Sequence, residues 1–413
     1  MQIENLSRYL YDKLDEFVEK GVLENKKIVL FGLNTSSYGT KHYLEQKGYQ
    51  IAAYVDNDKK KVEDNNDMID ILLPRHFAPE QYKRLEKEYI RAYFPAEYLQ
   101  PFREDAVILI ASKYYPEMCT QLEKMGYQEG VHILKTADFY DVEHVLNDGN
   151  WSEGLQEMTR EQVRKTQLGI LDHIKKVCDE NGIRYFLGAG TLLGAIRHKG
   201  YIPWDDDIDI NMPYPDYIKL MEILKDDEIY QPISVYQHQE SYPYFFSRVE
   251  DTRTIMKNWE YPFLITSGVS VDLFPIFGLP YQQTDVMPFY DEIRKRNNQL
   301  IESYIVYADA DENEIEKRKT LIDQIIEMME KYPYDETENI GYILSKHAEK
   351  DIMKRDVYES ALEASFEGET YKIMSGYDYY LTALYGDYME LPSEKEQRTT
   401  HSFQAYYKNQ TGA

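Results

Sequence analysis

The sequence predicts an α/β protein of two domains, the first with a parallel sheet and the second with a mixed sheet and a helical C-terminal part. The chain has 413 residues, which is more than a single hydrophobic core usually serves. Over the first third, short apolar runs alternate with helical patterns, as in a parallel sheet. Beyond residue 150, strand patterns that carry acidic residues lie among longer helices. We therefore expect a first domain at residues 1–150 and a second at 151–413.

The first domain is predicted to be Rossmann-like. An amphipathic helix over residues 5–20 precedes four runs with the composition of buried strands: 27–32, 50–55, 106–111 and 131–134. The turn at 31–37 lies where a dinucleotide fold carries its glycine fingerprint, and Asp56 lies near the position of a ribose-binding acid. The fingerprint GxGxxG itself is absent from this turn. A docking or structural role is therefore favoured over a nucleotide site.

The second domain begins with a long predicted helix. The polar stretch 138–154 has the composition of a linker, so the junction is placed near residue 150. A helix is then expected over 159–181, with Thr159 and Gln162 spaced as a capping box. After Pro280 the chain is predicted to be mainly helical, over four ranges: 283–304, 314–331, 338–347 and 375–385.

The stretch LGAGTLLGAIRHKGYIPWDDDIDINM, residues 187–212, contains the first candidate site. A short apolar run leads into a turn of small residues that includes Gly188, Gly190 and Thr191. This pattern predicts a strand that enters a helix, whose first N–H groups would face a phosphate. Such a turn is also common without any ligand, so its position in the motif matters.

The same stretch ends in Asp207-Ile208-Asp209-Ile210, where acidic and apolar residues alternate with the period of a strand. Asp207 and Asp209 would then share one face while the two isoleucines enter the core. Hard oxygen ligands of this kind suit Mg²⁺ or Mn²⁺ better than zinc. The alternative is a solvated acidic loop, which Asp205 and Asp206 alone could form.

The composition of the chain limits the classes of molecule that it could bind and the compartment in which it is expected. The net charge is −26, which argues against nucleic acid and against direct attraction to an anionic membrane, yet permits a small phosphorylated substrate. The two cysteines, Cys119 and Cys178, have no CxxC spacing, so a reducing cytoplasm is expected. The N-terminus lacks the apolar core of a signal peptide, and no run is long and apolar enough to predict a transmembrane helix.

The stretch LGAGTLLGAIRHKGYIPWDDDIDI resembles the signature of the LicD family and of the nucleotidyltransferase fold. This resemblance extends over roughly residues 155–407. It implies a third carboxylate on a later strand, for which Asp272 in GVSVDLFPIFGL is the candidate. The late YGDYMELP, residues 385–392, followed by Arg398 and His401, is also similar to the family's C-terminal pattern.

The resemblance assigns roles to several residues. Asp207, Asp209 and Asp272 would hold the metal and act in catalysis, while Asp272 or His401 would serve as the base. The donor would be bound by the glycine turn and by basic or imidazole side chains: Arg197, Arg248, Arg398 and His401. Arg197 could instead only stabilise the end of its helix, and His401 could be purely structural.

The implied activity is transfer of a phospho-alcohol group, phosphocholine or polyol phosphate, from a CDP-linked donor such as CDP-choline or CDP-ribitol. The acceptor would be a hydroxyl of a cell-surface glycan or glycolipid: teichoic acid, lipopolysaccharide or a capsule precursor. Such an acceptor would bring the protein to the inner face of the membrane. Two rival interpretations stay open, a nucleotidyltransferase acting on a small acceptor and a non-catalytic protein that binds nucleotide or glycan.

Overall fold

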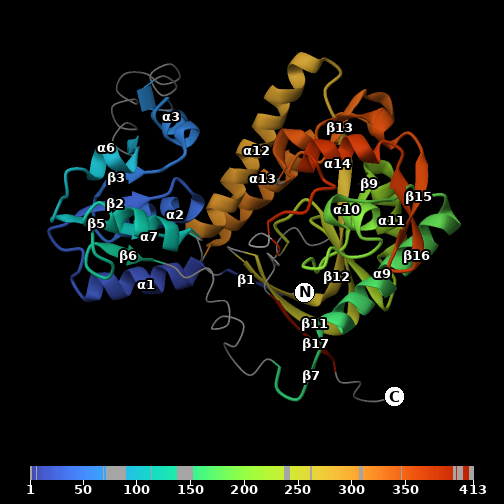
Figure 1. Ribbon diagram of the computed structural model, residues 1–413, viewed down its shortest axis with the longest axis horizontal. Helices are drawn as coiled ribbons and strands as arrows, with labels where there is room; N and C mark the ends of the chain where they lie inside the picture. Colours follow the sequence, from blue (N-terminus) through green and yellow to red (C-terminus); the bar gives the residue numbers. More distant parts are fainter. Residues whose placement is uncertain are drawn as a thin grey trace. The chain divides into compact units, whose positions relative to one another are not determined.

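The computed structural model describes residues 2–5, 7–67, 69–70, 90–112, 114–136, 152–236, 242–260, 263–306, 310–345, 347–393, 397 and 403–408. Tertiary contacts divide the chain into two compact units (Figure 1). Unit 1 comprises residues 1–4, 146–300 and 311–413, and unit 2 comprises residues 5–145 and 301–310. The five-stranded sheet is parallel and the ten-stranded sheet is mixed, which confirms the predicted fold class. The predicted junction near residue 150 lies outside the described residues.

Unit 2 contains a five-stranded parallel sheet in the order β4-β3-β2-β5-β6. In chain order this is 3-2-1-4-5, the arrangement of a Rossmann-like sheet. The central strands are apolar along their length and almost wholly buried, as expected where helices cover both faces. The strands are β2 (Lys27–Phe31), β3 (Ile51–Val55), β4 (Ala92–Tyr93), β5 (Ala106–Ile110) and β6 (Ile133–Lys135). The helices are α1 (Ser7–Glu19), α2 (Thr35–Gln46), α3 (Lys59–Asp67), α6 (Pro95–Leu99) and α7 (Tyr115–Glu123).

The polar residues that follow β2 and β3 bind backbone groups of the two loops that begin there. The Asp56 carboxylate accepts hydrogen bonds from the backbone N–H groups of Leu33 at 2.7 Å and Asp58 at 2.8 Å. Asn34 caps α2, with its Oδ1 accepting from the N–H of Ser37 at 2.9 Å. These contacts support the structural interpretation of the turn over a ribose site.

Unit 1 is built on a mixed sheet around two long antiparallel strands, β11 (Ser247–Glu260) and β12 (Phe263–Gly278). β9 (Asp209–Pro213) lies parallel to β12, and β8 (Phe186–Leu187) lies antiparallel to β9. The remaining strands of this sheet are short: β1 (Gln2–Asn5), β7 (Gln156–Glu157), β10 (Tyr230–Ile233), β13 (Asn339–Gly341), β14 (Met353–Lys354) and β17 (Phe403–Tyr407).

Most of the helices predicted for this part of the chain are present. They are α9 (Arg160–Asn181), α10 (Ala189–Arg197), α11 (Tyr214–Leu224), α12 (Gln283–Val306), α13 (Glu312–Glu330) and α14 (Tyr377–Tyr385). The capping box is confirmed, because Thr159 N donates to Gln162 Oε1 at 2.8 Å and Gln162 N donates to Thr159 Oγ1 at 3.3 Å. Gly182 ends α9 in the left-handed region at φ 60°.

The helix predicted over 338–347 is wrong. Strand β13 runs through this range and pairs with the end of β12 and with β14. Gly341 lies so close to the chain that an added Cβ would stand 2.6 Å from the carbonyl oxygen of Asp351. The hairpin of β15 (Ala361–Phe366) and β16 (Glu369–Met374) was not predicted either.

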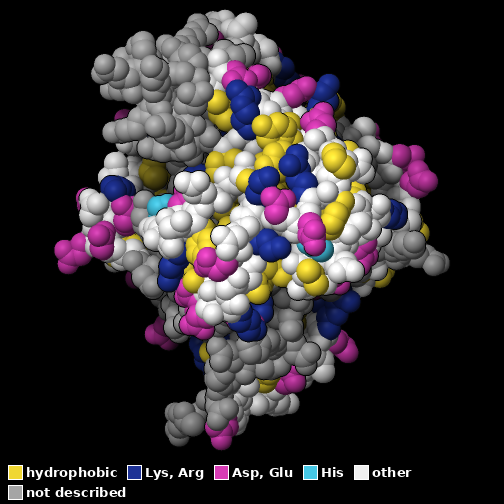
Figure 2. All heavy atoms as spheres, turned by 90° about the vertical axis from the view of Figure 1, so that its left-hand side faces the viewer, with side chains coloured by type: hydrophobic (Ala, Val, Ile, Leu, Met, Phe, Trp, Pro, Cys, Tyr) yellow, Lys and Arg dark blue, Asp and Glu magenta, His cyan; other side chains and the backbone are white. Residues whose placement is uncertain are grey.

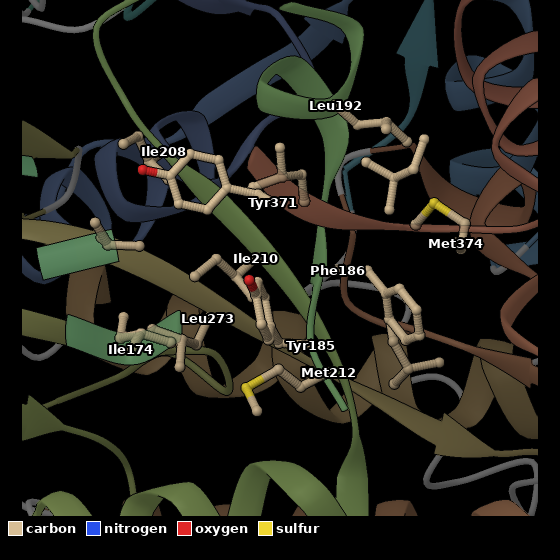
Figure 3. Packing of buried hydrophobic residues seen from close by; sticks show 14 of the residues in the cluster. Ile174, Tyr185, Phe186, Leu192, Ile208, Ile210, Met212, Leu273, Tyr371 and Met374 are labelled. Atoms are coloured by element: carbon tan, nitrogen blue, oxygen red, sulfur yellow. The ribbon is translucent and has the colours of Figure 1, made fainter. Parts of the chain in front are cut away.

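The core of unit 1 surrounds β9. Ile208, Ile210 and Met212 are fully buried. Figure 3 shows them beside Leu273 of β12 and among side chains of α9, α10 and β16. Because Asp209 alternates with these residues along the strand, burying the apolar side chains fixes the direction of the carboxylate.

No helix within the described ranges combines the length and apolar character needed to cross a bilayer. On the face shown in Figure 2, Lys and Arg side chains lie among Asp and Glu. The acidic excess is therefore interspersed with basic groups on that face.

Replacing Ile210 by Ala should lower the free energy of unfolding by about 2–5 kcal/mol, because it opens a cavity in a fully buried strand. Ile223→Ala is the matched control: Ile223 is 39% exposed, so a change of about 0.5 kcal/mol or less is expected. Urea unfolding of both variants measures the difference. Equal losses would contradict the placement of β9 at the centre of the core.

Candidate functional site

Strand pairing brings two of the predicted carboxylates together. Asp209 of β9 and Asp272 of β12 are direct partners in the parallel ladder, and Asp272 N donates to the carbonyl of Ile208 at 2.9 Å. Paired residues of neighbouring strands project to the same face of a sheet. Asp209 and Asp272 therefore share one face, on the side opposite the buried isoleucines.

Asp207 lies two residues before Asp209 and outside the strand. The sequence predicted a strand from Asp207 onward, but regular pairing of β9 begins at Asp209. Asp207 and Asp206 line a recess of about 50 Å³, together with Asp272 and Arg248. The structure thus gathers Asp207 and Asp272 around one small polar recess.

The donor set is chemically suited to a hard cation. Asp207, Asp209 and Asp272 offer only carboxylate oxygens, the ligands that Mg²⁺ and Mn²⁺ prefer. Their oxygens do not all lie within 4.8 Å of one another, so binding a shared ion would require side-chain rotation. Main-chain pairing holds the backbone of Asp209 and Asp272 in place, and the ion pair with Arg248 also holds the side chain of Asp272.

A tighter group of candidate ligands occurs in unit 2. Among the described residues, Cys119, Glu123 and Glu129 are the only set of three whose ligand atoms lie within 4.8 Å of one another. Burial raises the pKa of the Cys119 thiol, which disfavours the thiolate that binds a metal. Glu129 also accepts a hydrogen bond from Tyr115 at 2.8 Å. This group is therefore a poor metal site.

The glycine turn is bonded to Asp209 from both sides. Gly188 N donates to the carbonyl of Asp209 at 2.9 Å, and Asp209 N donates to the hydroxyl of Thr191 at 2.8 Å. Gly190 approaches Asp205 so closely that an added Cβ would stand 2.7 Å from its carboxylate. The Asp205 carboxylate thus lies by the α10 N-terminus, where negative charge is stabilised and where the sequence predicts a phosphate.

A buried polar cluster supports this turn, and sequence reasoning missed it. Asn211 donates from Nδ2 to the hydroxyls of Tyr358 and Tyr380, both at 3.0 Å. Tyr380 also accepts a hydrogen bond from the N–H of Ala189 at 3.3 Å. An added Cβ on Gly188 would stand 2.5 Å from Asn211 Oδ1, so only glycine fits there. The late tyrosines thereby position the start of α10.

Side chains on one face of α9 donate hydrogen bonds to backbone carbonyl groups of the acidic loop. Arg160 donates to the carbonyl of Asp205 at 2.7 Å, and Gln167 donates to that of Asp206 at 2.9 Å. Arg164 donates to the carbonyls of Ile202 and Asp205, and burial lowers its pKa. The spacing of Arg160, Arg164 and Gln167 on one helix face is a signal that could have identified them.

Arg248 is a direct neighbour of Asp272. The two are partners across β11 and β12, and Arg248 Nε lies 3.1 Å from Asp272 Oδ1. The Arg248 side chain is only 6% exposed, and its guanidinium lies 5.2 Å from the ring centre of Phe246. Arg253 pairs instead with Asp251, which raises the pKa of Arg253. Arg248 is thus a basic residue placed at the carboxylates.

Arg197 contacts the C-terminal motif. Its Nη1 donates to the carbonyls of Tyr388 at 2.7 Å and Glu390 at 3.1 Å. Arg197 therefore anchors the segment 385–392 beside the end of α10. A contact between Arg197 and the donor stays a prediction. Arg398 and His401 lie outside the described residues.

Comparisons with known proteins relate part of the chain to one family. Residues 182–305 match the family described as LicD/FKTN/FKRP, nucleotidyltransferase domain. The chain is 29% identical over 266 residues to the lipopolysaccharide cholinephosphotransferase LicD of Haemophilus influenzae, covering 61% of this chain and 99% of that protein. It is 32% identical over 72 residues to the ribitol 5-phosphate transferase FKRP of Mus musculus, covering 17% of this chain and 13% of that protein. An uncharacterized protein of Rickettsia prowazekii is 37% identical over 76 residues, covering 16% of this chain and 29% of that protein.

Thr191→Val should destabilise the protein by about 1–3 kcal/mol, because the buried N–H of Asp209 loses its acceptor. Thr191→Ser keeps the hydroxyl and should cost less than half as much. Chemical unfolding of the two variants provides the comparison. If both lose the same stability, the hydroxyl does not hold Asp209.

Proposed function

We propose that this protein is a metal-dependent transferase of phospho-alcohol groups, because residues 182–305 match the LicD/FKTN/FKRP nucleotidyltransferase domain. The observation that carries the proposal is the pairing of Asp209 with Asp272 on one face, with Arg248 at 3.1 Å from Asp272. Two carboxylates on adjacent parallel strands, joined by a third on the preceding loop, form an oxygen-rich site suited to a cation that carries a diphosphate.

The proposed donor is a CDP-linked alcohol, CDP-choline or CDP-ribitol. This choice is supported by the relatives, one of which is named a cholinephosphotransferase and another a ribitol 5-phosphate transferase. The proposed acceptor is a hydroxyl of a cell-surface glycan: lipopolysaccharide, teichoic acid or a capsule precursor. We place the protein in the cytoplasm, at the inner face of the membrane when it meets that acceptor.

Asp207, Asp209 and Asp272 would hold Mg²⁺ or Mn²⁺. An ion held there would supply positive charge to the diphosphate of the donor. Thr191 keeps Asp209 in place through the Asp209 N–H. Arg248 orients Asp272 through their ion pair. Asp272 or His401 takes the proton of the attacking hydroxyl, and the basic side chains Arg197, Arg248 and Arg398 compensate phosphate charge.

The glycine turn would contact the donor as well. Gly188 and Gly190 stand at the start of α10, where backbone N–H groups lack partners within the helix. A donor phosphate would compete with the Asp205 carboxylate for this position, because both are anions. Binding therefore requires Asp205 to turn away or to join the metal site.

The reaction itself separates the proposal from its nearest rival. Incubation with labelled CDP-choline, Mg²⁺ and a glycan acceptor should release CMP and transfer choline phosphate. A nucleotidyltransferase would instead release pyrophosphate from CTP and attach the nucleotide. Pyrophosphate release without CMP would overturn the proposed direction of transfer, and inertness in both assays would favour a binding protein.

Asp207→Asn and Asp272→Asn should each lower turnover at least about 100-fold, because each removes a charge from the proposed metal site. Asp226→Asn is the control, since Asp226 is an exposed acid of unit 1. Turnover at saturating donor, with circular dichroism to confirm folding, provides the test. Full activity in Asp207→Asn would exclude that carboxylate from the mechanism.

A further inference from the structure

The start of α10 contains a residue in an unusual backbone conformation. Ala189, the first residue of the helix, has φ 37°, in the left-handed region that residues with a Cβ seldom adopt. Glycines stand on both sides of it, at positions 188 and 190. The strain therefore falls on the one residue of this Gly-Ala-Gly turn that has a side chain, and the surrounding structure must hold it in place.

A side chain from a distant part of the sequence contacts this residue. Tyr380 lies on α14, which packs beside α10 (Figure 1). The Tyr380 hydroxyl accepts a hydrogen bond from the N–H of Ala189 at 3.3 Å. The penalty for alanine in the left-handed region is of the same order as the net contribution of one hydrogen bond. The bond from Ala189 to Tyr380 therefore offsets the strain at this position.

Asn211 fixes the position of the Tyr380 hydroxyl. Asn211 lies on β9 two residues after Asp209 and thus on the same face of the strand. Its Nδ2 donates to the Tyr380 hydroxyl at 3.0 Å, and both side chains are buried. Burial raises the pKa of Tyr380, so the hydroxyl stays protonated at neutral pH. The Tyr380 oxygen thus accepts two hydrogen bonds, which link the strand that carries Asp209 to the turn.

The N–H groups that follow Ala189 are those left for a phosphate of the donor. The first N–H groups of a helix have no partner within it, and that of Ala189 is taken by Tyr380. The N–H groups of Gly190 and Thr191 come next. Because the backbone angles are the only soft torsions of the chain, the φ and ψ angles of Ala189 set the direction in which these two groups point.

We propose that Tyr380 is a positioning residue for the donor: its hydrogen bond holds Ala189 in the left-handed conformation, which aims the N–H groups of Gly190 and Thr191 at the donor phosphate. This inference rests on the proposed function, because it takes the start of α10 as the site of that phosphate. Tyr380 acts through Ala189 and does not have to touch the donor. Its loss should therefore weaken donor binding while every carboxylate of the proposed metal site stays in place.

Tyr358 provides a matched control. It is buried like Tyr380, and its hydroxyl accepts from the same Asn211 Nδ2, also at 3.0 Å. Its ring lies against Phe186 of β8, with ring centres 5.4 Å apart. The N–H of Ala189 donates to Tyr380 and not to Tyr358. Replacing either tyrosine by Phe therefore removes one hydrogen bond to Asn211, but only Tyr380→Phe also releases Ala189.

Titration calorimetry on the full chain with Mg²⁺ measures donor affinity, with CDP-choline and CDP-ribitol as probes. Tyr380→Phe should bind the tighter of the two about five- to tenfold more weakly than the wild-type chain, as expected for the loss of one hydrogen bond. Tyr358→Phe should bind it within about twofold of the wild-type affinity. Urea unfolding should show similar shifts of the midpoint for both variants. Equal donor affinity of the two variants would overturn the proposal, because Tyr380 would then have only a structural role.

Ala189→Gly tests whether Tyr380 acts through the backbone. Glycine adopts the left-handed conformation at little cost. Ala189→Gly should therefore restore the affinity of Tyr380→Phe to within about twofold of wild type, and it should change the affinity of the wild-type chain by less than about twofold. No recovery in the double variant would contradict a path through Ala189. If the wild-type chain binds neither probe, the proposed function fails and this inference fails with it. If the wild-type chain binds and Tyr380→Phe binds equally well, only this inference fails.

Discussion

Parallel pairing of β9 with β12 is the constraint on which the candidate site depends. The pairing sets Asp209 opposite Asp272, and the burial of Ile208, Ile210 and Met212 prevents the strand from slipping by one residue. A slip of that kind would send both the apolar and the acidic side chains to the wrong faces. The register that buries the apolar side chains is therefore also the register that places the two carboxylates on one face.

Around this pair, hydrogen bonds to backbone groups hold the chain segments that carry the acidic residues. The hydroxyl of Thr191 binds the N–H of Asp209, while α9 holds the carbonyls of Asp205 and Asp206. Arg248 is the exception, because it contacts a carboxylate directly. The site thus combines a frame of backbone hydrogen bonds with an ion pair at one of its acids.

The sequence predicted the features that are determined by residues close to one another along the chain. The capping box at Thr159 and the alternation of acidic and apolar residues at β9 follow from short-range periodicity, whereas Asp272 was a candidate only through the resemblance to a known family. The helix predicted over 338–347 failed because β13 forms through pairing with β12 and β14, partners that are distant in sequence. Asn211 with Tyr358 and Tyr380 was missed for the same reason, since 147 and 169 residues separate the members.

The grip of α9 on the acidic loop has a consequence for interpreting variants. The contacts from α9 go to backbone carbonyl oxygens, and they are made by Arg160, Arg164 and Gln167. Every residue within a chain has such a carbonyl group, whatever its side chain. Changing a loop carboxylate to an amide leaves these bonds intact. The contacts from α9 are thus independent of the side chains at positions 205 and 206, so Asp→Asn substitutions there can alter reactivity and metal preference without removing these hydrogen bonds.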